Sequence, residues 1–499
     1  MYRENNVETS REIPSSLEVP VRNLAVELHA NNRRVITLPF DVGAKSRADM
    51  IFSYVERLTD AEVDKTLEAV MRSFAAWHKR IEEQLDEHYA MAARTAHRRE
   101  QPSRNRRLLI GAYFTREYSF ESAALFNPSI VPHPQQDGLP AASLRFIMSM
   151  RAVGEGHVSS VIFRTGVIGT GHTVSFDRPA PYAARTRLVP DKDYHKDLFR
   201  MKLGEMGVNL LVADIVLNVL PDRFTLNDLA LTIAQHSGKT HGLQSVASSM
   251  EWLARANYQL QLAPEDSISD LMLFPRSDSE SKGIEDLRLV KFIDDDGTTS
   301  YFGTYTAFDG RHVLPMLLQT DDFRTVAVHT LNGSCVTNKG MALFPRRING
   351  RYAICSRIDG RKLFLMYSDN VHFWHSARVL AEPKYPWEFR LMGNCGSPIE
   401  TPAGWLLITH GVGPMRRYCL GAMLLDLGDP STIIGRLKQP LIAPPEHQRE
   451  GYVPNVVYSC GSLIHGDSLI LPYAVADTSV RIAVVPLQEL LAQLLRDGP

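Results

Sequence analysis

Two carboxylates and a guanidinium fall within four residues near the middle of the chain, in the tetrapeptide Glu285-Asp286-Leu287-Arg288. The tetrapeptide follows a Ser/Lys/Gly loop and precedes a strand-like apolar run at 289–293. A carboxylic acid held at a strand entrance beside a fixed cation suits proton transfer to a polar substrate. A surface loop with a local ion pair is the simpler interpretation of an isolated Glu-Asp-x-Arg. The surrounding chain therefore has to decide between the two.

The composition is ordinary for a soluble globular protein. The 499 residues are enough for two or three domains, and hydrophobic residues make up 44% and charged residues 22%. The formal net charge of -1 gives no overall attraction to nucleic acid or to a membrane surface. No run approaches ~18 uninterrupted apolar residues, and the first six residues are polar, so we expect no membrane span and no signal segment.

Five cysteines occur, an odd number with no Cys-x-x-Cys pair. They are Cys335, Cys355, Cys395, Cys419 and Cys460. Reduced thiols in a cytoplasmic protein fit this pattern better than a disulfide framework or a zinc site. No His/Cys/Asp cluster has the spacing of metal ligands, so we expect neither a metal nor an organic cofactor.

The first part of the chain has a helical pattern. Thr59 and Glu62 form a capping-box signature, and apolar residues then recur at three- and four-residue steps. This stripe predicts one long amphipathic helix that runs to about Ala93, within an N-terminal helical region of residues 1–115. A basic patch follows at 94–107, without interleaved aromatic residues. We interpret it as a solvated helix end and linker, and predict no nucleic-acid partner.

The remainder alternates between strands and helices before it becomes β-rich. Strand patterns at 144–151 and 158–164 belong to a segment of residues 116–190, and helical patterns return within 191–258. From 259 to 499 an aromatic residue, an alternating strand and a polar tip recur. The copies start at 301, 352, 405 and 469, close to the ~40–50-residue spacing of propeller blades.

With residues 144–163 as an earlier copy, the repeats predict a mainly β protein built as a five-bladed β-propeller. Its first blade would be residues 116–190, and the helical segment 191–258 would be inserted between the first two blades. A β-sandwich with coincidental spacing is the alternative. The helical regions could support a homo-oligomer.

Six motifs in order also resemble a known family. They are Gly283–Arg288, Tyr301–Ala307, Leu343–Tyr352, Ser397–Gly411, Tyr418–Leu427 and Tyr473–Asp477. The set is similar to glycoside hydrolase family 130, which consists of inverting β-mannoside phosphorylases and β-1,2-mannosidases on a five-bladed propeller. The resemblance covers residues 123–495 apart from the helical segment. The extra N-terminal helical region indicates a long-chain branch.

The resemblance implies a role for each residue that matches a family motif. Asp286 would be the general acid, although Leu287 stands where the family usually has proline. In the phosphorylases, this proton is thought to travel through a hydroxyl of the bound mannose. A general acid must be protonated near neutral pH, so we expect burial or Glu285 to raise the pKa of Asp286. The implied substrate-binding residues are Asn127, Ser129, Arg151, Glu285, Arg288, His410, Tyr418 and Asp477.

The implied phosphate positions decide between phosphorolysis and hydrolysis. Lys339 and Arg357 stand at two cationic positions, but Glu400 stands where phosphorylases have lysine. A carboxylate repels phosphate. Glu400 could instead be the general base that an inverting hydrolase needs. In a phosphorylase it would have to turn away or pair with a cation such as Arg416 or Arg417.

Three functions remain open on these grounds. The favoured one is inverting phosphorolysis of β-mannoside oligosaccharides, with inorganic phosphate as co-substrate and α-mannose 1-phosphate as product. The alternative is an inverting β-1,2-mannosidase with Glu400 as base. The third is a non-catalytic propeller that binds glycans or a protein, which the presence of Asp286, Arg288 and Asp477 disfavours.

Overall fold

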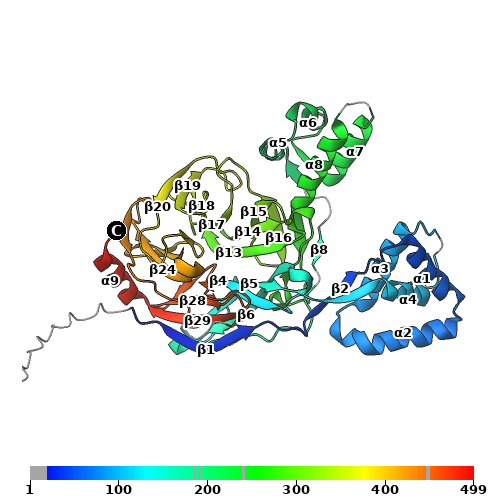
Figure 1. Cartoon of the computed structure of the whole chain (residues 1–499), viewed down its shortest axis with the longest axis horizontal. Helices are drawn as coiled ribbons and strands as arrows, with labels where there is room; N and C mark the ends of the chain where they lie inside the picture. Colours follow the sequence, from blue (N-terminus) through cyan, green and yellow to red (C-terminus); the bar gives the residue numbers. More distant parts are fainter. Residues whose placement is uncertain (1–18, 100, 185, 190–192, 239–241, 446–449) are drawn as a thin grey trace, which may run out of the picture.

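A computed structural model describes residues 19–99, 101–184, 186–189, 193–238, 242–445 and 450–499. Figure 1 shows a large β-rich body with two helical regions that project from it. The prediction of a mainly β protein with added helices is therefore confirmed.

The described part of the N-terminal region holds four helices and a small two-stranded sheet. The helices are α1 (Lys45–Arg57), α2 (Asp60–Phe74), α3 (Ile81–Thr95) and α4 (Arg104–Tyr113). The capping box of Thr59 and Glu62 is present at the start of α2. The single long helix, however, is wrong. The chain breaks between α2 and α3, where Arg80 has a φ of 57° and forms an ion pair with Glu265 in the β-rich body. Tertiary pairing overrides the helical pattern there.

The basic patch lies within this region, and its arginines bind acidic residues of the neighbouring helices. Arg106 donates to Asp60 at 2.8 Å, and Arg107 donates to Asp86 at 2.9 Å. Arg104 pairs with Glu82. These contacts fasten α4 to α2 and α3, so the patch stabilises the region from within and is more than a solvated linker.

Two strands also correct the expectation of a wholly helical N-terminal region. Strand β1 (Arg22–His29) pairs antiparallel with β29 (Ser479–Pro486), and β2 (Val35–Pro39) pairs with β3 (Thr115–Ser119). The pattern of β1 alternates between exposed and half-buried residues, as expected of a strand with one solvated face. Residues 1–18 of the predicted region lie outside the described residues.

The β-rich body consists of antiparallel sheets that follow one another along the chain (Figure 1). One contains β17 (Lys339–Leu343), β18 (Tyr352–Arg357), β19 (Leu363–Ser368) and β20 (Ala377–Ala381). The next contains β21 (Leu391–Asn394), β22 (Ile399–Thr401), β23 (Gly404–Val412), β24 (Tyr418–Leu425) and β25 (Ile433–Arg436). Another contains β26 (Val457–Tyr458), β27 (Leu463–His465), β28 (Ser468–Val475), β29 and β1.

The largest sheet joins two antiparallel groups of strands. The first group is β4 (Ala124–Pro132), β5 (Leu144–Val153), β6 (Ser159–Ile168), β7 (Val174–Phe176) and β12 (Met272–Leu273). The second is β13 (Gly283–Ile293), β14 (Thr299–Phe308), β15 (Val313–Thr320), β16 (Thr325–Thr330), β11 (Tyr258–Gln261) and β8 (Arg187–Leu188). They meet at one parallel pair, Gly283 with Ser159. A Cβ at position 283 would lie 2.3 Å from Ser159 Oγ, so glycine is required for this approach.

Four helices lie between β7 and β11 in the chain. They are α5 (Lys196–Glu205), α6 (Leu210–Leu217), α7 (Leu226–His236) and α8 (Leu243–Ala256). With the short strands β9 (Asp193–His195) and β10 (Arg223–Thr225) they enclose an apolar core of their own, which includes Phe199, Phe224 and Met250. Lys202 donates to the carbonyl of Leu331 at 2.8 Å and anchors α5 to the β-rich body. The last helix, α9 (Leu487–Asp497), packs on the sheets β21–β25 and β26–β29.

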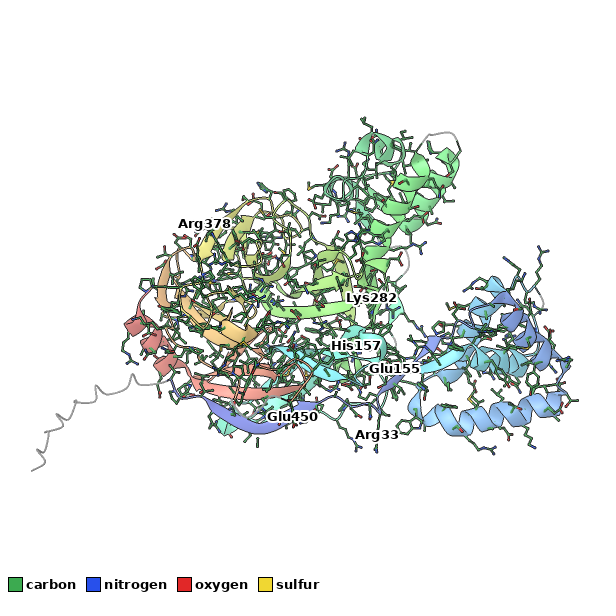
Figure 2. All side chains as sticks on the ribbon, viewed as in Figure 1. Arg33, Glu155, His157, Lys282, Arg378 and Glu450 are labelled. Atoms are coloured by element: carbon green, nitrogen blue, oxygen red, sulfur yellow. The ribbon has the colours of Figure 1, made fainter. Side chains whose placement is uncertain are left out.

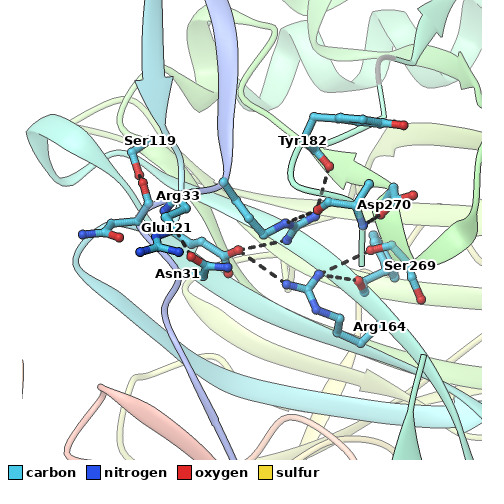
Figure 3. Close-up of polar contacts among 12 residues, drawn as sticks. Asn31, Arg33, Ser119, Glu121, Arg164, Tyr182, Ser269 and Asp270 are labelled. Atoms are coloured by element: carbon cyan, nitrogen blue, oxygen red, sulfur yellow. Dashed lines mark hydrogen bonds and ion pairs between the residues drawn. The ribbon is translucent and has the colours of Figure 1, made fainter. Parts of the chain in front are cut away.

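A buried ion network supports the start of β4. Glu121 is 0% exposed, and it accepts hydrogen bonds from Arg34 at 2.9 Å and from Arg164 at 3.4 Å (Figure 3). Asp270, labelled in the same view, accepts a bond of 2.7 Å from the Ala180 amide. Because a buried charge is stable only when it is paired, the network fixes Glu121 and with it the strand that begins three residues later.

Candidate active site

Backbone irregularities place the candidate functional side chains. The register of β4 with β5 shifts between Phe126 and Ser129, and that of β13 with β14 shifts between Glu285 and Arg288. Asn127 and Asp286, which lie in these two bulges, have φ values of 51° and 57°. Bulges redirect side chains, and strained backbone of this kind gathers at functional sites. Both residues thereby face each other from different strands.

Asp286 lies among polar groups from three strands. Asn127 Nδ2 donates to Asp286 Oδ1 at 2.6 Å, and an Arg151 nitrogen lies 3.8 Å from the same oxygen. Arg288 donates from NH1 to the backbone carbonyl of Asp286 at 2.9 Å. The side chain of Asp286 remains 13% exposed, so it is held firmly but stays accessible.

The pKa of Asp286 is shifted in the direction opposite to the one expected from the sequence. Burial raises it, but the positive charges of Arg288, Arg151 and Lys339, with the hydrogen bond from Asn127, outweigh burial and lower the pKa below its ordinary value. The predicted rise is therefore wrong: the pKa is lowered, and this carboxyl is ionised at neutral pH. Glu285 does not counteract the cations, because it is bound to two of them.

Glu285 joins two of the predicted binding residues. Its Oε1 accepts a hydrogen bond from Arg151 at 2.8 Å, and its Oε2 accepts one from Lys339. The Lys339 side chain is 33% exposed, against 13% for Glu285. Lys339 is therefore the more exposed member of this ion pair.

Arg288 belongs to the supporting structure of the site. It is 2% exposed, and besides the Asp286 carbonyl it donates to Asn394 Oδ1 at 3.2 Å and to the Tyr458 hydroxyl at 2.7 Å. Sequence reasoning missed Asn394 and Tyr458. Asn394 lies just upstream of the Ser397–Gly411 motif, which was the one signal available for it.

Arg357 and His410 are two further predicted site residues that contact each other. Arg357 NH1 lies 3.4 Å from His410 Nε2, and His410 Nδ1 lies 3.1 Å from the Asn394 carbonyl oxygen. Burial, with Arg357 and Arg288 nearby, holds the pKa of His410 well below its usual range. The neutral ring therefore donates from Nδ1 and accepts at Nε2. Tyr418 stacks beside it, with ring centroids 6.2 Å apart and planes 17° apart.

Asp477 has the raised pKa that was expected of Asp286. Burial, the largest cause, and the charge of Asp286 raise its pKa to about 7, while Arg151 and Arg416 lower it. Its φ of 49° places it at a tight corner between β28 and β29. The two carboxyl groups thus differ in protonation near neutral pH, with Asp286 ionised and Asp477 titrating.

Two predicted residues lie apart from this group. Ser129 is 0% exposed, and its hydroxyl accepts a hydrogen bond from the Leu289 amide at 3.0 Å, so it holds β13 against β4. Glu400 accepts two hydrogen bonds from Arg346, at 2.7 and 2.8 Å, and its side chain is 42% exposed. The sequence suggested Arg416 or Arg417 as the cation that pairs with Glu400, but its partner is Arg346. This pair lowers the pKa of Glu400.

In the part of the chain that the structure describes, no group of three or more His, Cys, Asp or Glu side chains is arranged to hold a metal ion. No helix of that part is long and apolar enough to cross a membrane. All five cysteines are unpaired.

Comparison with known proteins gives matches in sequence and in structure. A solved structure of β-1,2-mannobiose phosphorylase from Listeria innocua aligns with a TM-score of 0.42 and 20% identity, over 74% of this chain and 92% of that chain. The family model of glycoside hydrolase family 130, described as beta-1,4-mannooligosaccharide phosphorylase, matches residues 265–496.

Characterised relatives match the same part of the chain. A 1,2-beta-oligomannan phosphorylase from Thermoanaerobacter sp. is 34% identical over 43% of this chain and 72% of the relative. A beta-1,2-mannobiose phosphorylase of that strain is 36% identical over 41% of this chain and 68% of its own length. At this identity and coverage, the chain belongs to glycoside hydrolase family 130.

Proposed function

We propose that this protein cleaves β-mannosides by inverting phosphorolysis and releases α-mannose 1-phosphate. An oxygen of inorganic phosphate attacks the anomeric carbon from the face opposite the leaving sugar. The glycosidic C–O bond breaks as the leaving oxygen takes a proton that originates from Asp286. The relatives named above are phosphorylases of β-1,2-linked mannosides, which supports the same reaction class here.

The excess of positive charge around Asp286 carries this proposal. Four basic side chains lie at the site, together with three carboxyl groups. The cations are Arg151, Arg288, Lys339 and Arg357, and the carboxylates are Glu285, Asp286 and Asp477. The basic side chains outnumber the carboxyl groups, and Asp477, with a pKa of about 7, carries only part of a negative charge near neutral pH, so the site complements a phosphate dianion. Arg357 in particular is not paired with any carboxylate among the described residues, and its Nε has no hydrogen-bond partner.

Phosphate also accounts for how an acid with a lowered pKa acts near neutral pH. The same cations that hold down the pKa of Asp286 would bind the incoming dianion. Once phosphate is bound, its charge offsets theirs, and the pKa of Asp286 rises toward the range of a general acid. Proton donation then depends on the presence of the co-substrate. The family's route through a mannose hydroxyl is compatible with this arrangement.

Neither alternative has a supporting observation of this kind. Hydrolysis needs a second carboxylate that holds water opposite the acid. Glu400 is bound instead to Arg346 on an exposed edge. A purely glycan-binding propeller has no need for a strained carboxylate held between cations, as Asp286 is.

The proposed architecture is a five-bladed propeller. Separating the largest sheet at the single pair of Gly283 and Ser159 leaves, besides two two-stranded sheets, five antiparallel sheets of four or more strands among the described residues, which supports this blade count. On this view the helices within 191–258 form an insertion between the first two blades. Residues 1–115 remain a separate N-terminal region apart from β1. The register of β17 with β18 also shifts, between Lys339 and Ala342. Closure of the ring would bring the bulges of β4, β13 and β17 to a common central site.

Two further parts of the proposal concern the setting of the enzyme. Five unpaired cysteines, four of them buried, fit a reducing compartment such as the cytoplasm. The helical regions would mediate self-association. On α6, Leu211 is 83% exposed, which supports a contact surface there.

The decisive experiment incubates the protein with β-1,2-mannobiose, and separately with β-1,4-mannobiose, with and without inorganic phosphate. Phosphorus and proton NMR then identify the products and their anomeric configuration. We expect cleavage that requires phosphate and yields α-mannose 1-phosphate with one equivalent of mannose. Full turnover to free mannose in phosphate-free buffer would identify a hydrolase. The proposal is contradicted if neither disaccharide is cleaved, whether phosphate is present or not.

A further inference from the structure

We propose that Tyr452 forms an aromatic platform on which the sugar that leaves during cleavage stacks. The proposal rests on the proposed function for the identity of the sugar, a pyranose of the β-mannoside, and adds a residue that determines how that sugar is held. No sequence motif singled out Tyr452, and it lies outside the group of charged residues described above.

Tyr452 is an exposed aromatic residue held rigidly beside the site. Tyr452 is 43% exposed. The centroid of its ring lies 6.4 Å from that of Phe126, with the planes 29° apart. Its hydroxyl oxygen lies 2.9 Å from Nδ1 of His157, which Figure 2 labels on the loop between β5 and β6. An exposed ring that is fixed at both its face and its hydroxyl loses little conformational freedom when a ligand binds.

The backbone of Tyr452 is fixed as well. Its amide donates to Thr478 Oγ1 at 2.7 Å, one residue from Asp477. Gly451 precedes it, and a Cβ at that position would lie 2.5 Å from the Cβ of Ala476. Glycine therefore allows the segment to pack directly on the corner that carries Asp477. The platform and the titrating carboxyl share one rigid support.

A short path of contacts joins the platform to the acid. The Arg151 guanidinium lies 5.2 Å from the centroid of the Phe126 ring, and it also lies 3.8 Å from Asp286. Phe126 directly precedes Asn127, which binds Asp286. Tyr452 is therefore linked to the acid through residues of β4 and β5. Lys339 and Arg357, the cations proposed to bind phosphate, come from β17 and β18.

Inversion requires the nucleophile and the leaving group to occupy opposite faces of the sugar that is transferred. With phosphate on the side of β17 and β18, the leaving sugar is on the side of β4, where Tyr452 lies. The C–H face of a pyranose ring is weakly positive and apolar, and it complements the electron-rich face of an aromatic ring. A stacked sugar there would present its bridging oxygen toward Asp286.

The test uses the full-length protein with Tyr452→Ala, Tyr452→Phe and, as a matched control, Tyr54→Ala, which removes an exposed tyrosine of the N-terminal helices. Synthesis is measured from α-mannose 1-phosphate with mannose as acceptor. We expect Tyr452→Ala to raise the acceptor KM about tenfold, and to change the KM of α-mannose 1-phosphate less than about twofold. Tyr452→Phe keeps the ring and should retain most of the acceptor affinity.

A binding measurement keeps the platform testable apart from phosphorolysis. Calorimetric titration measures the affinities of the Asp286→Asn variant for β-1,2-mannobiose and for mannose. The same titrations are made with the double variant that also carries Tyr452→Ala. Loss of affinity for the disaccharide alone supports the platform even if the wild-type protein performs no phosphorolysis. An unchanged acceptor KM together with unchanged disaccharide affinity would overturn it. Equal losses for mannose and mannobiose would also overturn it, because they would place Tyr452 at the transferred sugar.

Discussion

Asn127 donates a hydrogen bond of 2.6 Å to Asp286 and so links β4 to β13 at the centre of the candidate site. Both residues lie in β-bulges with positive φ, so the contact depends on two local departures from regular strand geometry. The amide can only donate to this oxygen, and it favours the ionised carboxylate. The structure therefore holds Asp286 oriented and charged.

The first prediction concerns Asp286 itself. Asp286→Asn keeps the shape of the side chain but removes the proton it would donate. We expect the rate of α-mannose 1-phosphate release to fall on the order of 10²-fold or more, without loss of folded protein. Asp222→Asn, at a side chain that is 94% exposed in the helical segment, is the matched control. Near-normal turnover of Asp286→Asn would exclude the acid role.

The second prediction concerns phosphate. Arg357→Ala removes the cation that has no carboxylate partner among the described residues. We expect the apparent KM for phosphate to rise on the order of tenfold or more, with a much smaller change in the KM for mannobiose. Arg361→Ala removes an exposed arginine four residues away and serves as control. A rise in the KM for mannobiose alone would assign Arg357 to the sugar instead.

The third prediction separates Glu400 from the chemistry. Glu400→Gln should change kcat by less than about twofold, since the carboxylate is bound to Arg346 away from Asp286. The ion pair is about 40% exposed on both sides, so its loss should change the free energy of unfolding by at most about 1 kcal/mol. Steady-state kinetics and thermal unfolding measure both quantities. Loss of cleavage in the Glu400→Gln variant would instead support hydrolysis with Glu400 as the general base.

The fourth prediction uses the raised pKa of Asp477. A carboxyl with a folded-state pKa of about 7 binds its proton more tightly than in the unfolded chain, where the pKa is about 3.9. The stabilisation from this proton is complete below about pH 4 and is lost as the pH rises through about 7. Asp477→Asn should therefore raise Tm by about 2–4 °C at about pH 8, and change it little at about pH 4.

Activity provides the complementary measurement for the same variant. Because Asp477 is expected to hold the mannosyl unit, Asp477→Asn should lose turnover even where it gains stability. A Tm difference that is constant from about pH 4 to about pH 8 would show that the carboxyl does not titrate as proposed.

The sequence predicted the parts of this structure that depend on local pattern. The starts at 301, 352, 405 and 469 fall in β14, β18, β23 and β28, which are strands of successive sheets. The capping box at Thr59 was found because its two hydrogen bonds join residues three positions apart. Asp286 was singled out because two carboxylates and an arginine are adjacent in the chain.

Features that depend on distant contacts were beyond the sequence. Ion pairs of Arg80 with Glu265 and of Lys79 with Asp266 lie at the break before α3. Strand β1 is fixed by its pairing with β29, which is also far away in the sequence. The direction of the pKa shift at Asp286 depends on cations from β5 and β17, and no local pattern reports their approach. Tyr458 has no motif around it, and its role follows from its contact with Arg288.

The pairing of β1 with β29 has a consequence for how the protein is made. Residues 22–29 are synthesised long before their partner at 479–486. Until then β1 has an unpaired edge, and the sheet of β26–β29 is incomplete. The helices of residues 45–113 and the other sheets can form before this, whereas the sheet of β26–β29 and β1 can be completed only after residues 479–486 have been synthesised. Deletion of residues 479–486 would therefore leave β1 and β28 without the strand that they share, and expose strands prone to aggregation.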